Sequence, residues 1–116
     1  MVEALNRDFE MEETLCTAIQ KHRVVRLKYA DDAEWRIFRP QAVYWSTVDR
    51  INVTGIQTRN ENDPSVTEAE VRNFVLAQIK DVQVTYEEFE FDATIDPTEE
   101  RFANGIICII HPMKLG

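Results

Sequence analysis

Four basic residues of this sequence are spaced so that together they could bind an anion. Arg26 and Lys28 alternate with apolar residues in a strand-like segment, and Arg36 has the same outward-facing parity on the next segment. We expect Arg72 to lie across from them. A cluster of this kind binds phosphate groups. Alternatively, these cations neutralise nearby acids and shield one face of a sheet.

Aromatic residues stand close to these basic residues in the sequence. Trp35, Tyr44 or Trp45 could stack on a nucleic-acid base beside the bound phosphates. The opposing interpretation is that they pack in the core or at corners, because a small sheet needs large side chains. The candidate ligand-binding residues are Arg26, Lys28, Arg36, Tyr44 and Arg72.

The remaining polar residues do not indicate catalysis. The two histidines, His22 and His111, lie at opposite ends of the chain, and neither has the spacing of a metal ligand. The sequence contains no Gly-rich phosphate loop, nucleophile elbow or Cys–His pairing. We interpret the carboxylates at 87–90 and 99–100 as solvated charge. The prediction is a protein that is not an enzyme, with no catalytic residue, metal or cofactor.

The elements that must position the basic residues are mainly β-strands. Five short strand-like segments follow one another, and a sixth around 79–84 completes a sheet. The five are Val24–Tyr29, Glu34–Phe38, Ala42–Trp45, Ile51–Thr58 and Val71–Ala77. This order predicts a mainly β fold with an N-terminal helix (α+β), rolled into a small antiparallel barrel. The 116 residues form one domain, 1–116, which buries roughly 65% of its unfolded surface.

A polar helix is predicted to precede the sheet. Its apolar residues fall mostly at helical spacing, and either Asp8 or Thr14 could cap its start. A ridge of Met11, Leu15 and Ile19 should pack across one open end of the sheet. We interpret the glutamates of this helix as a solvated face.

Two residues should distort the strands. Pro40 has no backbone N–H, so the strand must end or kink there, and the chain then turns a corner. Gly55 interrupts a β-branched run, which indicates a bulge or a close backbone approach. The polar stretch 58–70 is the longest connection inside the barrel and is predicted to be a loop.

An unusually apolar segment lies near the end of the sequence. Residues 96–100 have the composition of a helix start, with Pro97 in the first turn. The isoleucine-rich strand that follows has no polar face and should be buried on both sides. It either closes this domain's own sheet or contacts a second copy or protein partner. The residues of that contact would be Ile106, Ile107, Ile109 and Ile110.

Charge and cysteine usage limit the partners and the compartment. Residues 21–80 hold ten Lys and Arg against eight acids, but the whole chain has a formal net charge of −8. Such a chain repels a polyanion at long range, so non-specific binding to duplex DNA is not expected. No apolar run reaches the ~20 residues that span a bilayer, and no secretory signal is visible. We expect Cys16 and Cys108 to be reduced, buried thiols in a cytoplasmic protein.

The order of these segments resembles the WYL domain, a small Sm-like β-barrel. In that family, a helix and a strand ending in tyrosine lead to a basic strand that ends at a proline. A Gly-containing strand and a final strand with Arg, Phe and Ile follow. The matching positions, within about residues 18–88, are Tyr29, Pro40, Gly55, Arg72, Phe74 and Ile79. A Sm-like barrel would then occupy 23–88, between a helix at 8–22 and a C-terminal helix/strand extension at 93–116.

The chain departs from that family at several positions. Residues 51–53 stand in place of the Trp-Tyr-Leu tripeptide, and Val75 and Gln78 stand where the family usually has arginines. WYL domains are associated with bacterial transcription and defence regulators that are thought to sense nucleotides or single-stranded nucleic acid. The resemblance implies a stand-alone ligand-sensing or regulatory domain. The alternative is an interaction or oligomerisation module that kept the barrel and lost the ligand surface.

Overall fold

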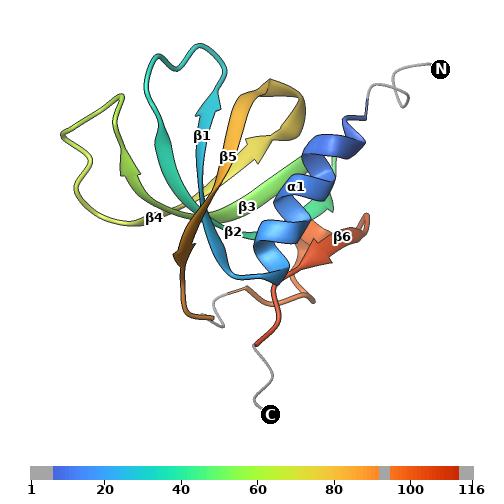
Figure 1. The fold of residues 1–116 in the computed structure, drawn as a ribbon. Helices are drawn as coiled ribbons and strands as arrows, with labels where there is room; N and C mark the ends of the chain where they lie inside the picture. The colour runs from blue at the N-terminus through green and yellow to red at the C-terminus, as the bar shows by residue number, and fades with distance from the viewer. Residues whose placement is uncertain (1–6, 92–94, 113–116) are drawn as a thin grey trace.

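Among the residues that the structure describes, the fold is one antiparallel sheet with one α-helix at its N-terminal end. The computed structural model describes residues 7–91 and 95–112. Within them the order along the chain is α1 (Phe9–Gln20), β1 (Arg23–Tyr29), β2 (Arg36–Trp45), β3 (Ile51–Asn60), β4 (Glu70–Val75), the 3-10 turn η2 (Leu76–Gln78), β5 (Ile79–Glu88), the 3-10 turn η3 (Glu100–Phe102) and β6 (Ile106–Ile109). The strands lie in the order β4-β3-β2-β1-β5, and β6 pairs with β2 (Figure 1). This confirms the predicted mainly β, α+β fold.

Helix α1 begins where the sequence predicted. The side chain of Asp8 accepts a hydrogen bond from the Met11 amide at 3.0 Å, so Asp8 rather than Thr14 caps the helix. The buried face includes Leu15 and Ile19, whose side chains are fully covered by the sheet. In the part of the chain that the structure describes, no helix is long and apolar enough to cross a membrane.

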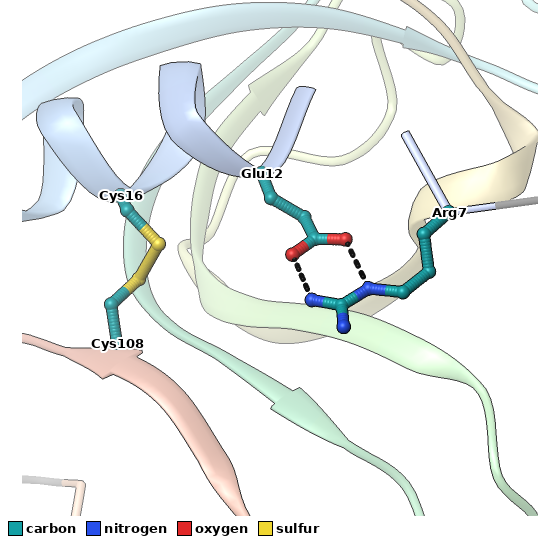
Figure 2. Close-up of a disulfide and its surroundings, with 4 residues drawn as sticks. All are labelled: Arg7, Glu12, Cys16 and Cys108. Atoms are coloured by element: carbon teal, nitrogen blue, oxygen red, sulfur yellow. Dashed lines mark hydrogen bonds and ion pairs between the residues drawn. A yellow bond between two sulfur atoms is a disulfide. The ribbon is translucent and has the colours of Figure 1, made fainter. Parts of the chain in front are cut away.

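One glutamate of α1 is buried, which contradicts the prediction of a solvated glutamate face. Glu12 is only 5% exposed and accepts two hydrogen bonds from the Arg7 guanidinium, at 2.6 and 3.1 Å (Figure 2). These hydrogen bonds, opposed by burial, raise the pKa of Arg7 above its ordinary value. The sequence pattern could not reveal this pair, because Arg7 precedes the helix and folds back over it.

The core lies beneath the face of β1 that the alternation pattern predicted. Val25 and Leu27 are fully buried, whereas Arg26 and Lys28 are half-buried. Val25 pairs with the fully buried Phe38 of β2 and with Val84 of β5, which is 44% exposed at the edge of the sheet. The helix closes over this face, and the packed hydrophobic residues include Leu15, Ile19, Val43, Val53, Phe74, Phe89 and Ile110.

Pro40 does not end a strand, so the prediction of two strands on either side of it is wrong. Strand β2 runs without a break from Arg36 to Trp45. Its register against β3 shifts between Pro40 and Ala42, which marks a bulge. At a bulge the ladder is locally interrupted, so a residue without an N–H is tolerated there. Strand β2 therefore pairs with β3 along its length, and with β1 and then β6 on its other side.

Gly55 is a site of close backbone approach, as the sequence predicted. It lies opposite Pro40 in the β2–β3 ladder and is completely enclosed. A Cβ atom at this position would lie 2.3 Å from the Arg39 carbonyl oxygen and 2.7 Å from Cζ of Phe38. The backbones of β2 and β3 therefore meet too closely at this bulge for any side chain.

The C-terminal part differs from the predicted helix and strand. Within the described residues it contains the three-residue turn η3 and no helix, so the predicted C-terminal helix is not seen. Strand β6 pairs with β2 of the same chain, which is the closing role predicted as one alternative. Residues Ile106–Ile109 are half-buried rather than fully covered, and Ile110 is buried.

Cys16 and Cys108 form a disulfide, so the prediction of reduced thiols is wrong. Their Cα atoms are 5.9 Å apart, and the bond joins α1 to β6 (Figure 2). The two residues are separated by 92 positions in the sequence. They meet because α1 packs against the sheet beside β6, a contact that depends on the whole sheet. Cysteine spacing alone gave no sign of it.

Candidate functional site

Four basic side chains share the face of the sheet that points away from the core. Arg26 of β1 pairs with Ile37 of β2, and Ile37 pairs with Arg59 of β3. Residues in direct register share a face, and so do residues two apart on one strand. The group that we call the basic face consists of Arg26, Lys28, Arg39 and Arg59.

Trp35 organises one side of the basic face. The guanidinium carbon of Arg26 lies 4.5 Å from the centre of a Trp35 ring, and Nζ of Lys28 lies 4.7 Å from it. The Trp35 ring is half-buried. The backbone that carries it is fixed by a hydrogen bond from the Glu61 amide to the Trp35 carbonyl at 2.9 Å. The ring attracts both cations through its electron-rich face. Trp35 therefore keeps two like charges close together.

The basic face has no direct carboxylate partners in the described structure. The ion pairs found among residues 7–91 and 95–112 use other arginines: Arg7, Arg23, Arg36, Arg72 and Arg101. The nearest acid by register is Asp81 of β5, which pairs with Lys28 in the ladder without forming an ion pair. The basic face is therefore available for an external anion.

Arg36 lies on the opposite face, so its predicted outward position is wrong. It pairs in the ladder with the buried Leu27 and therefore shares the core-facing side. Its guanidinium donates to Asp32 at 2.7 and 3.1 Å and to the Gln57 side chain at 3.1 Å. Burial alone would raise the pKa of Asp32, but hydrogen bonds from Arg36 and the Tyr29 amide, with the charge of Arg36, hold it below its ordinary value. Arg36 is thus engaged inside the fold.

Tyr44 and Arg72 also lie outside the basic face. Tyr44 is 3% exposed, and the Phe102 ring covers it at 4.9 Å, so Tyr44 cannot stack on a base. Its hydroxyl donates to the Asn73 side chain at 3.3 Å. Arg72 donates to Glu70 at 2.8 Å and pairs in register with Gly55. Of the five predicted ligand residues, only Arg26 and Lys28 come together.

Sequence reasoning missed Arg39 and Arg59. The signal for Arg39 was present, because Phe38 must face the core and its neighbours therefore face outward. The same argument places Arg36, two residues from Phe38, on the core side. The signal for Arg59 was absent, because its face depends on a register shift between Ile37 and Phe38.

The described residues contain no candidate metal site. Among the residues whose positions the structure describes, no three His, Cys, Asp or Glu side chains are grouped so that they could hold a metal ion. The geometry instead offers the cationic and aromatic groups of the basic face. Comparison of the chain with protein-family models, with curated proteins and with solved structures finds no match.

Proposed function

We propose that the basic face binds a phosphate-bearing ligand, either a nucleotide or a short single-stranded nucleic acid. The observation that carries this proposal is the group of four cations on one face with no carboxylate partner in the described structure. Arg26 and Arg59 lie two strands apart, roughly 10 Å from each other, so an extended ligand could contact both. The proposal assigns binding and not catalysis to this chain.

The overall acidity of the chain bears on the length of the ligand that we propose. A formal net charge of −8 repels a long polyanion before it reaches the basic face. A nucleotide or a few linked nucleotides carry fewer negative charges and are repelled less. Trp35 provides an aromatic ring beside the cations. We therefore propose a short ligand whose binding weakens as salt concentration rises.

The family assignment is part of the same proposal. We propose that the chain is a divergent WYL-like domain with a Sm-like barrel at residues 23–88, acting in a bacterial transcription- or defence-related context. It is supported by the order of elements, one helix followed by five strands of a single antiparallel sheet. The loss of the family's arginines at Val75 and Gln78 would be offset by Arg39 and Arg59, on another face.

The composition and the disulfide point to different compartments. A cytoplasmic location stays a prediction, but glutathione and thioredoxin keep most cytoplasmic thiols reduced. The Cys16–Cys108 bond therefore counts against the cytoplasm, and with it against the transcription- or defence-related context proposed above. Alkylation of free thiols in protein taken from its native cells distinguishes the two, because a cytoplasmic protein would be labelled at both cysteines.

Replacing Arg26 and Lys28 together by Ala should weaken binding of a labelled six-nucleotide single strand at least tenfold at low salt. Each lost charge-assisted hydrogen bond costs about 1.5–3 kcal/mol. The salt dependence should also become shallower, by about 0.7 in slope for each phosphate contact removed. Fluorescence anisotropy measures both quantities.

Two variants serve as controls for this experiment. Arg72→Ala removes an arginine that is paired with Glu70, and Arg50→Ala removes an exposed cation from the turn before β3. Both should bind the oligonucleotide as the unaltered protein does. If Arg72→Ala weakens binding as much as the double variant, the basic face is not the site.

A second candidate function is assembly through the open edges of the sheet. Strands β4 and β5 are each paired on one side only within the described sheet. They carry exposed hydrophobic residues: Val71 on β4 and Val84 and Tyr86 on β5. Unpaired strand edges are templates for another chain. We propose that β4 of one copy pairs with β5 of the next, a head-to-tail contact that forms rings or filaments.

The variants Val71→Lys and Tyr86→Lys should each shift such an assembly toward monomer, because each places a charge on one of the two edge strands. Light scattering after gel filtration measures the mass, and circular dichroism checks the fold. Val48→Lys is the matched control, since Val48 is 70% exposed in a turn away from both edges. A monomeric unaltered protein at high micromolar concentration rejects this contact. The same monomeric result would argue against a subunit contact through the isoleucine-rich strand β6.

A further inference from the structure

A small hollow lies where β2, β3 and β4 approach the residues that follow β5. Its volume is about 300 Å³, at the lower end of the range for small-molecule sites. It adjoins the basic face through one shared residue, Arg39. The lining residues that matter for its chemistry are Arg39, Gln41, Ile56, Glu70, Phe89 and Glu90.

Two polar atoms at this hollow have no hydrogen-bond partner in the described structure. Gln41 is 1% exposed, and its amide nitrogen donates to the Arg39 carbonyl at 3.2 Å, but its Oε1 accepts nothing. Nε of Arg39 is likewise buried and unpaired. Buried polar atoms without partners are uncommon in folded proteins, so a neighbouring donor and acceptor in this state indicate a missing partner. Both atoms are covered, so a ligand can reach them only if the residues around them move.

The charges of the hollow are mixed. Arg39 supplies a guanidinium and Glu90 a carboxylate, while the carboxylate of the lining residue Glu70 is bound by Arg72. Glu70 shares its charge with Arg72, and Glu90 forms no ion pair among the residues described. Ile56 and the buried Phe89 form an apolar wall. The Glu90 carboxylate repels a phosphate, and Arg39 repels a simple amine or a metal ion.

We propose that this hollow binds a free α-amino acid with an apolar side chain. The ligand carboxylate accepts two hydrogen bonds from the Arg39 guanidinium, one of them from the unpaired Nε. The ligand ammonium has three N–H donors, which match Oε1 of Gln41 and the two oxygens of the Glu90 carboxylate. The apolar side chain covers Ile56 and Phe89. Each unpaired or unlike-charged group of the hollow then has a partner on one small zwitterion.

The test is calorimetric titration of the full chain with L-leucine, L-valine and L-phenylalanine. At least one should bind, and its N-acetyl and carboxamide derivatives, which lack the ammonium and carboxylate charges, should bind at least tenfold more weakly. Glu90→Gln should weaken the amino acid at least fivefold. Glu87→Gln, an exposed glutamate on β5 outside the hollow, should leave its affinity unchanged.

Three results would overturn the proposal. They are no binding of any of the three amino acids at millimolar concentration, equal binding of the blocked derivatives, or equal loss in the Glu90 and Glu87 variants. The inference does not rest on oligonucleotide binding. Lys28→Ala should leave amino-acid affinity unchanged while weakening the oligonucleotide, and Glu90→Gln should not weaken the oligonucleotide. Failure of one site is therefore distinguishable from failure of the other.

Discussion

Loss of the Cys16–Cys108 disulfide should lower the free energy of unfolding by about 4 kcal/mol and the melting temperature by about 15 °C. The bond closes a loop between residues separated by 92 positions, and a crosslink across so long a loop removes much of the entropy of the unfolded chain. It also ties α1 to β6, the two elements at opposite ends of the described chain. Thermal and urea unfolding of the reduced and oxidised protein measure the difference.

The control is the double variant Cys16→Ala/Cys108→Ala. It should be as unstable as the reduced unaltered protein and should not respond further to a reductant. The reduced protein should stay folded at room temperature, because Leu15, Ala18 and Ile19 still hold α1 on the core. A melting temperature that is the same with and without reductant would show that the disulfide does not constrain the fold.

Gly55→Ala should destabilise the protein by at least about 3 kcal/mol. The added methyl carbon meets the Arg39 carbonyl at 2.3 Å, and the carbonyl belongs to backbone that cannot rotate away. Relief requires β2 and β3 to separate at the bulge, beside fully buried Phe38 and Val53. Urea unfolding monitored by tryptophan fluorescence measures the loss.

Gly105→Ala provides the comparison for this prediction. Gly105 has φ of 118°, but the nearest atom to an added Cβ is Cδ1 of Trp45 at 3.8 Å. The cost at Gly105 is therefore conformational, about 1 kcal/mol, without a clash. If the two variants lose equal stability, the close approach of β2 and β3 at Gly55 is not what excludes a side chain.

The sequence by itself determined the local features of this protein. Alternation placed Val25 and Leu27 in the core and Arg26 and Lys28 outside it, because side chains on a strand point alternately to opposite faces, although Val24 is buried as well. Asp8 was one of two predicted caps, and close approach was one of two interpretations of Gly55, since each follows from the chemistry of one residue and its neighbours. The mainly β fold follows from the same local patterns.

Only the tertiary structure decided which distant residues meet. Register placed Arg36 inside with Asp32, the cover of Phe102 buried Tyr44, and the packing of α1 beside β6 joined Cys16 to Cys108. A shift of one residue at a bulge moves a side chain to the other face, and no local pattern specifies that shift. The basic face and the hollow beside Gln41 are therefore products of strand pairing. Their residues come from several segments of the chain, and no local pattern specifies that these segments meet.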